Sequence, residues 1–116
     1  MVTSDEASRI AMSLPGAEQR EHWGKPSFRV RDKIFAVIRP DGVSLVLKTT
    51  KDDRLAYTTM APDIFGMPDS FANLAYMIVR LDRIEPSECR ELIVQAWRLV
   101  SPKRAVAAYD RGNEGG

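Results

Sequence analysis

Apolar residues follow a helical spacing in two stretches of the chain, residues 3–14 and 86–100. In the first stretch, Thr3 and Glu6 have the spacing of a capping box, and a Pro-Gly pair follows the last apolar position. The second stretch begins with Pro86, a residue favoured at the first position of a helix, and keeps an apolar stripe to its end. We therefore expect one helix near each end of the domain.

Between these stretches, residues 27–49 alternate between apolar and polar side chains, which is typical of β-strands. A two-residue turn at residues 32–33 and a three-residue loop at residues 40–42 divide this segment into three antiparallel strands. A fourth strand is expected at residues 75–81. These registers predict an inward-pointing face that carries Phe28, Val30, Phe35, Val37, Leu45, Leu47, Met77, Val79 and Leu81.

The opposite face of the predicted sheet mixes basic and branched apolar side chains. It carries Arg29, Arg31, Ile34, Ala36, Ile38, Val46, Lys48, Tyr76, Ile78 and Arg80. A face that meets only water is usually more polar than this. We therefore expect either a surface for a partner or a face partly covered by the chain itself, and the residues do not distinguish the two.

These elements predict an α+β fold, a two-layer sandwich in which the N- and C-terminal helices pack on one face of an antiparallel sheet. After the third strand, Thr50 is expected to cap a short helix, and an irregular connection follows it. The last helix is expected to add to the core Leu92, Ile93 and Trp97. We expect a single domain over residues 1–109 and a disordered tail over residues 110–116.

The composition is that of an ordinary globular protein. Of the 116 residues, 44% are hydrophobic and 28% are charged, which excludes an intrinsically disordered chain. No apolar run reaches the roughly 20 residues of a membrane span. The acidic side chains within the first ten residues do not fit a signal peptide. We therefore expect a cytoplasmic protein that has no membrane partner.

The net charge of +1 conceals one basic segment. Residues 25–51 carry seven basic and two acidic side chains, whereas residues 1–24 carry two and four, and residues 52–116 carry eight and ten. The candidates for contact with nucleic-acid phosphates are Arg29, Arg31, Lys33, Lys48, Lys103 and Arg104. The alternative is that these charges keep an apolar sheet face soluble, since the pI of 7.9 is below the roughly 9 of strongly basic binders.

The chain offers little for catalysis or metal binding. His22 is the only histidine, and neither a nucleophile motif nor further metal ligands accompany it. Cys89, the only cysteine, lies on the apolar stripe of the last helix, and we expect it to be buried. The segment that contains His22 and Trp23 is expected to be a loop that docks the first helix onto the first strand, with Trp23 covering the end of the core. With no phosphate loop or dinucleotide fingerprint either, we expect neither an enzyme nor a cofactor.

Four segments stand out along the chain: LPGAEQREHWGKPSFRVRDKIFAVIRPDG, LVLK, VRLD and ELIVQAWRLVSPKR. In their order and spacing they resemble the MmcQ/YjbR family of small bacterial proteins. The resemblance covers residues 7–105, and its most specific parts include Trp23-Gly24 and the Lys33-x-Phe35 pattern. It implies a fold similar to the α+β sandwich of frataxin-like proteins.

The resemblance also implies DNA binding through a double wing of β-hairpins. In this chain the wings correspond to the tips at Asp32-Lys33 and Pro40-Asp41-Gly42, and Lys33 matches the family pattern, as does the lysine of LVLK, Lys48. Members of the family often have a glycine where this chain has Asp32. They also often have His, Tyr or Lys where this chain has PDSFANLAY. Both departures weaken an anionic-ligand site at those two places.

Together these observations predict a small non-enzymatic protein that binds DNA weakly, through phosphate contacts from the hairpins and the basic sheet face. The alternative is a homodimer or other protein-interaction module that uses the same face, with the basic residues at its rim. No small-molecule ligand is indicated by the sequence.

Overall fold

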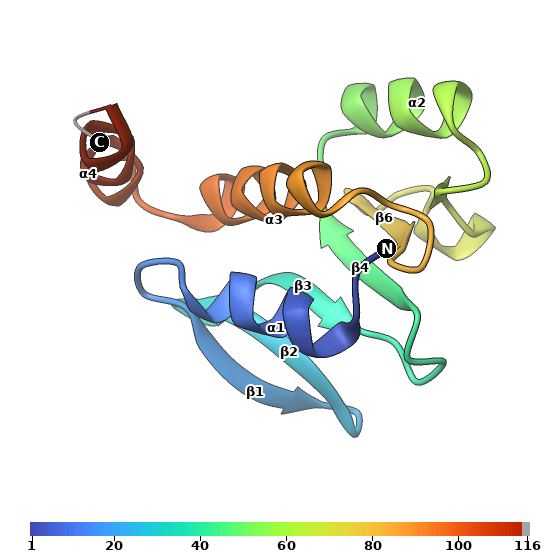
Figure 1. The fold of residues 1–116 in the computed structure, drawn as a ribbon, viewed down its shortest axis with the longest axis horizontal. Coiled ribbons are helices and arrows are strands. Elements are labelled where there is room, and N and C mark those ends of the chain that lie inside the picture. The colour runs from blue at the N-terminus through green and yellow to red at the C-terminus, as the bar shows by residue number, and fades with distance from the viewer. Residues whose placement is uncertain (115–116) are drawn as a thin grey trace.

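The computed structural model describes residues 1–114, in which six antiparallel strands form one sheet (Figure 1). The strands are β1 (Glu18–His22), β2 (Lys25–Val30), β3 (Lys33–Ile38), β4 (Ser44–Lys48), β5 (Phe65–Gly66) and β6 (Tyr76–Arg80). Their order across the sheet is β1-β2-β3-β4-β6-β5, so β6 lies between β4 and β5. The β1–β2 hairpin forms one edge of the sheet, and the short β5 forms the other.

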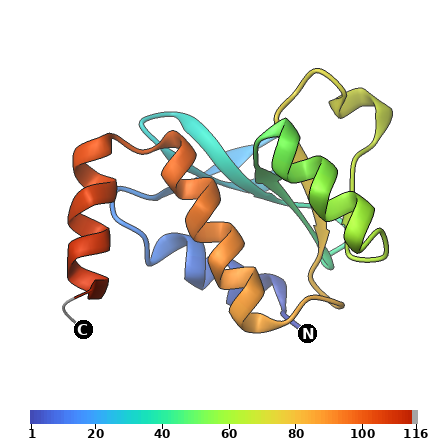
Figure 2. The same cartoon turned by 90° about the horizontal axis from the view of Figure 1, so that it is seen from above.

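The helices of the described residues pack on one face of this sheet (Figures 1 and 2). They are α1 (Ser4–Met12), α2 (Lys51–Met60), α3 (Pro86–Val100) and α4 (Lys103–Glu114), with a short 3-10 turn at Asp69–Phe71. Helices α1 and α3 contact each other and cover the middle of the sheet, α2 contacts β5 and β6, and α4 lies at the end of α3. The predicted α+β fold, with helices on one face of an antiparallel sheet, is confirmed.

The helix starts follow the predicted capping chemistry. The Thr3 hydroxyl oxygen accepts a hydrogen bond from the Glu6 amide at 3.1 Å, and the Thr50 hydroxyl oxygen accepts one from the Asp53 amide at 3.1 Å. Helix α3 has the predicted bounds and begins with Pro86 at its first turn. Helices α1 and α2 therefore begin at side-chain caps within their own segments, whereas no side chain caps α3 and its start is marked by Pro86.

The segment around His22 and Trp23 is a β-hairpin, and the predicted docking loop is wrong. Strand β1 pairs with β2 so that His22 lies opposite Lys25, which leaves Trp23 and Gly24 as a two-residue turn. Both turn residues have positive φ, 54° and 78°, as the favoured two-residue hairpin turns require. The Trp23 side chain is 87% exposed and does not cover the core.

Trp97 takes the role that was predicted for Trp23. Its side chain is fully buried on α3, and its indole N–H donates to the Pro15 carbonyl oxygen at 2.8 Å. This bond ties α3 to the loop that follows α1. The ring of Tyr109 on α4 packs against Trp97 with centroids 5.2 Å apart.

The register of the β2–β3 hairpin also differs from the prediction. Val30 lies opposite Lys33, so the turn consists of Arg31 and Asp32, with φ of 52° and 67°. The register then shifts between Phe28 and Arg29, a β-bulge that leaves one additional residue on β3.

The bulge changes which residues of β3 face the helices. Phe35 and Ala36 are both buried, and Ile38 is buried as well, whereas Val37 is only half-buried on the opposite face. The prediction that Val37 points inward and that Ala36 and Ile38 point outward is therefore wrong.

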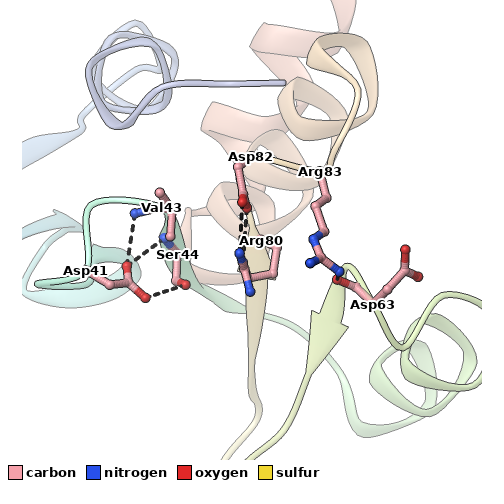
Figure 3. A network of polar contacts seen from close by, with 7 residues as sticks. All are labelled: Asp41, Val43, Ser44, Asp63, Arg80, Asp82 and Arg83. Carbon is pink, nitrogen blue, oxygen red and sulfur yellow. Dashed lines mark hydrogen bonds and ion pairs between the residues drawn. The ribbon is translucent and has the colours of Figure 1, made fainter.

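The same shift lengthens the β3–β4 loop to four residues, because Arg39 bonds to Ser44 and Ile38 pairs with Leu45. Asp41 shapes this loop from within, as Figure 3 shows. One of its carboxylate oxygens accepts from the amides of Val43 at 3.0 Å and Ser44 at 2.9 Å, and the other accepts from the Ser44 hydroxyl at 2.7 Å. The predicted three-residue loop is wrong by one residue.

The core lies between the sheet and helices α1 and α3. The predicted core residues that are buried are Phe28, Val30, Phe35, Leu45, Leu47, Leu92, Ile93 and Trp97. On β6, Met77 and Val79 point inward as predicted, and Leu81 after it is buried too. Cys89 is buried on α3 as expected, and burial raises the pKa of its thiol to about 11.

The connection between α2 and β6 is held by a buried arginine. The Arg54 guanidinium donates to the carbonyl oxygens of Phe71 at 3.0 Å, Leu74 at 2.5 Å and Tyr76 at 2.9 Å. No carboxylate of residues 1–112 pairs with it, so backbone carbonyls satisfy this cation. One side chain thus orders a segment that has little regular structure of its own.

Helix α4 extends to Glu114, so residues 110–114 are helical although we expected a disordered tail there. Residues 115 and 116, the rest of that predicted tail, lie outside the described residues. Arg98 on α3 forms an ion pair with Asp110 on α4 at 2.5 Å, which fastens the added turns to the domain. None of the described helices has the length and apolar character needed to cross a membrane.

Candidate nucleic-acid interface

The sheet face opposite the helices forms the candidate interface, which we call the outer face. It consists of the half-buried Arg29, Ile34, Val37, Arg39, Val46, Lys48, Tyr76, Ile78 and Arg80, with His22 and Lys25 toward the β1–β2 turn. Within residues 1–114, no helix packs on it (Figures 1 and 2). Of the two readings of this face that the sequence left open, the structure favours a surface that is not covered by its own chain.

An apolar row crosses the middle of the outer face. Val37, Val46 and Ile78 lie directly opposite one another on β3, β4 and β6. Each is half-buried, because neighbours in the sheet cover its flanks while no helix of residues 1–114 lies above it. Branched side chains in this row provide a flat apolar floor between basic residues.

Arg29 lies along the outer face of β2. Its Nε donates to the Ser27 hydroxyl oxygen at 3.2 Å, and its Nη2 lies 3.3 Å from Nδ1 of His22. Because a guanidinium can only donate, this contact requires His22 Nδ1 to act as the acceptor. The two hydrogen bonds hold the guanidinium close to the sheet and direct it toward the β1–β2 turn.

Lys48 and Tyr76 form the next part of the face. They lie opposite each other on β4 and β6, and the ammonium of Lys48 lies 5.0 Å from the centre of the Tyr76 ring. The Tyr76 hydroxyl donates to the Ile34 carbonyl oxygen at 3.2 Å. Burial raises the pKa of this hydroxyl above its usual value of 10, and the nearby Arg29 opposes the shift. The tyrosine therefore stays neutral and works as a platform for the lysine.

Two other arginines, Arg20 on the neighbouring edge strand and Arg80 on the outer face itself, already form ion pairs. Arg20 on β1 forms ion pairs with Glu18 at 3.2 Å and Asp32 at 3.1 Å. Arg80 forms a bidentate pair with Asp82, drawn in Figure 3, with bonds of 3.0 and 2.8 Å. That hydrogen bonding lowers the pKa of Asp82 and raises the pKa of Arg80.

Besides Lys25 near the β1–β2 turn, three cations of the outer face form no ion pair with a carboxylate in the described part of the chain: Arg29, Arg39 and Lys48. A groove of about 510 Å³ adjoins this group. It is lined by Arg39 and Arg80 and by the segment 62–68, which contains β5. The face therefore has a net positive charge that its own carboxylates leave uncompensated.

The predicted site residues fall in three places. Arg29 and Lys48 lie on the outer face, as predicted. Arg31 is an exposed residue of the β2–β3 turn, and Lys33 is exposed beside it, opposite the inward-pointing Val30. Lys103 and Arg104, the remaining two, are exposed in the first turn of α4, in the layer of helices. The structure brings together Arg29 and Lys48 but does not bring the α4 pair to the sheet.

The sequence reasoning missed Arg39 and the contribution of β1. Arg39 points outward only because the bulge in β3 shifts the phase of that strand by one residue. Strand β1 is polar on both of its faces and so shows no alternation. The available signal was the Trp23-Gly24 pair, since a glycine at the second position of a two-residue turn between polar segments is a hairpin signal.

The model of the family described as YjbR matches residues 12–99 of this chain, which include the whole sheet. The chain belongs to the YjbR family. By sequence comparison, the chain is similar to uncharacterized proteins of Mycobacterium bovis and Mycobacterium tuberculosis. Each is 29% identical over 125 aligned residues, which cover 94% of this chain and 96% of the relative.

A solved structure has the same fold as this YjbR protein. It is the crystal structure of a Deinococcus radiodurans protein of the DUF419 domain family. The two superpose with a TM-score of 0.76 and 20% sequence identity, over 89% of this chain and 81% of the other. The likeness extends the shared architecture of the YjbR fold to a distant sequence.

Proposed function

We propose that the protein binds nucleic acid weakly through phosphate contacts on the outer face. The observation that carries this proposal is the group formed by Arg29, Arg39 and Lys48, none of which forms an ion pair with a carboxylate within residues 1–112. Arginine and lysine at such positions contact phosphate oxygens without reading sequence. Arg31 and Lys33 extend the same charge to the tip of the β2–β3 hairpin.

The geometry of the face supports a polyanion better than a single small anion. The three cations lie on β2, directly after β3 and on β4, and these strands lie side by side, so the charges are spread across the sheet. An extended chain of phosphates can meet charges spaced in this way, whereas one small anion cannot. Apolar floor between the charges leaves room for sugars and bases.

The salt dependence of binding tests this proposal. Each phosphate that a cation neutralises releases counterions, so log affinity falls with log salt by about 0.9 per contact on duplex DNA and about 0.7 on a single strand. Replacing Arg29 or Lys48 by Gln is expected to remove about one phosphate contact each and to reduce the slope by the amount of that contact. Each replacement should weaken binding to every sequence alike. Fluorescence anisotropy of labelled DNA over a salt series measures both quantities.

Arg90→Gln is the matched control, because Arg90 is an exposed arginine of α3 in the layer of helices. It removes the same charge from the protein but leaves the outer face intact, so its slope should equal that of the wild type. If Arg90→Gln and Arg29→Gln reduced the affinity for DNA and its salt slope equally, only the net charge of the protein would matter. No retention of DNA by the wild type at low salt would contradict the proposal.

Homodimerisation is the second candidate, and the row of Val37, Val46 and Ile78 is the observation that favours it. A flat apolar row on an uncovered face resembles the centre of a protein interface. The cations argue against it, because a two-fold axis through the row would bring two copies of Arg29, Arg39 and Lys48 toward each other. We therefore place it second.

A further inference from the structure

The tip of the β1–β2 hairpin combines an exposed aromatic ring with a left-handed backbone. Trp23 has φ of 54° and its side chain is 87% exposed. A large side chain in this region of φ is strained, and the favoured sequence for such a turn is Asn-Gly. An indole in water adds no burial to the core, so the turn bears this strain without any gain in stability.

On the outer-face side of the turn, the neighbours of the ring are basic, whereas Glu21, next to His22 on β1, alternates to the other side. The His22 ring meets Trp23 edge-on at 6.3 Å and also contacts the Arg29 guanidinium, which links the indole to the outer face. Lys25, across the turn from His22, forms no ion pair in the described part of the chain. A partner that touches the ring therefore also meets two uncompensated cations.

We propose that Trp23 is a stacking platform for an unpaired nucleobase, so that the preferred ligand of this protein is single-stranded nucleic acid. This inference rests on the proposed phosphate binding and specifies its ligand. Single-strand binding proteins combine a basic surface, which follows the backbone, with aromatic rings on which bases stack. The β1–β2 tip supplies the ring, and Lys25 and Arg29 supply charge for the phosphates on either side of the stacked base.

The single strand is favoured over the duplex because of how the ring is presented. The indole stands on a two-residue turn at the edge of the sheet and has almost all of its surface free. The bases of a duplex are stacked on one another and offer no free face, whereas those of a single strand do. Stacking tolerates any base, so we expect little sequence preference.

The test compares two ligands that share a backbone. One is a labelled oligothymidylate, and the other is an oligomer of the same length built from abasic sites, which keeps the phosphates but has no bases. Trp23→Asn removes the ring and introduces the residue that this turn prefers, so the variant is expected to be at least as stable as the wild type. The variant should bind oligothymidylate roughly 5- to 150-fold more weakly than the wild type does. Its affinity for the abasic oligomer should equal that of the wild type.

Two further measurements isolate stacking from folding. Because Trp97 is buried, oligothymidylate should quench the exposed Trp23 emission of the wild type, and Trp23→Asn should lose this response. The salt slope should be the same in both proteins, since no phosphate contact is removed. Leu55→Ala, which removes an exposed apolar side chain from α2, serves as the control and should change none of these results.

The outcomes separate this inference from the proposed function. Equal binding of oligothymidylate by the wild type and Trp23→Asn overturns the stacking role and leaves the phosphate contacts standing. If Trp23→Asn loses the same affinity for both oligomers, the stacking role is overturned too, because the abasic oligomer has no base on which the ring could stack. If the wild type binds neither oligomer at low salt, the proposed function fails and the inference fails with it.

Discussion

Asp41 shows how much one side chain contributes to the shape of the β3–β4 loop. Its two carboxylate oxygens accept three hydrogen bonds from Val43 and Ser44. Hydrogen bonding from the Ser44 hydroxyl, with smaller help from the backbone amides, lowers the pKa of this carboxyl below its usual value of 3.8, although burial opposes the shift. The ionised form is therefore the one that the folded loop favours.

A carboxyl whose pKa is lower in the folded state stabilises the protein above its unfolded value and loses that effect as the pH falls through the folded value. We therefore expect Asp41→Ala to reduce the free energy of unfolding by about 1 kcal/mol at pH 7. The difference from the wild type should shrink below about pH 4. Urea unfolding of both proteins between pH 7 and pH 2 measures it.

Asp41→Asn is the companion variant for this experiment. It keeps a side-chain oxygen that can accept from the amides of Val43 and Ser44 but does not titrate. Its stability should therefore follow pH without the step that belongs to Asp41. If the difference in the free energy of unfolding between the wild type and Asp41→Asn stays constant down to pH 2, the charge of the carboxylate does not contribute to stability.

At the scale of the element, α3 carries much of the core, and Leu92 is one of its buried residues. Leu92 is 4% exposed and faces the sheet, whereas Leu99 on the same helix is 47% exposed. Leu92→Ala should reduce the free energy of unfolding by roughly 2–5 kcal/mol, because it removes buried methyl groups and leaves a cavity. Leu99→Ala should cost well under 2 kcal/mol. Denaturant unfolding of both variants decides, and equal costs would contradict this account of the core.

The strands show where reasoning from the sequence works and where it stops. Strand β6 was predicted correctly, including its two faces, because it alternates without interruption. In β3 the alternation breaks at Phe35 and Ala36, and a run of five apolar residues from Ile34 to Ile38 fits either phase. The bulge that decides between the phases depends on packing against α1 and α3, which the strand alone does not encode.

The candidate site was predictable in part for the same reason. Arg29 and Lys48 were placed on the correct face, since burial alternates over residues 28–30 of β2 and residues 45–48 of β4. Arg39 was missed because it lies beyond the bulge, and Trp23 was assigned to the core because a large ring usually gains from burial. Trp97, on the apolar stripe of α3, has the buried position and the hydrogen bond to Pro15, whereas the glycine after Trp23 was the local signal of a turn.

At the scale of the whole molecule, the two faces of the sheet differ in what they contribute. The inner face meets α1 and α3 and holds the core, while the outer face meets no helix in residues 1–114. The apolar row on the outer face allows the two candidate functions to be tested against each other. A dimer through this face would depend on Val46, whereas the proposed nucleic-acid binding would depend on Lys48, two residues further along β4.

Val46→Lys places a charge in the centre of the apolar row. If the protein is a dimer through this face, the variant should sediment as a monomer at concentrations where the wild type does not, since the centre of an interface carries most of the binding energy. If the face binds phosphates, the added lysine should instead strengthen DNA binding at low salt. Sedimentation velocity and anisotropy on the same samples measure the two effects. A wild type that sediments as a monomer at every concentration excludes the dimer.

The uncovered outer face has a consequence for how this fold can diversify. Substitutions at Arg29, Val46 or Ile78 change a surface that adds little to the core, so they can accumulate without unfolding the protein. Packing between the helices and the inner face maintains the fold, while the outer face can acquire a different charge pattern in another lineage. Two proteins can therefore keep the same backbone at 20% identity and still recognise unrelated molecules.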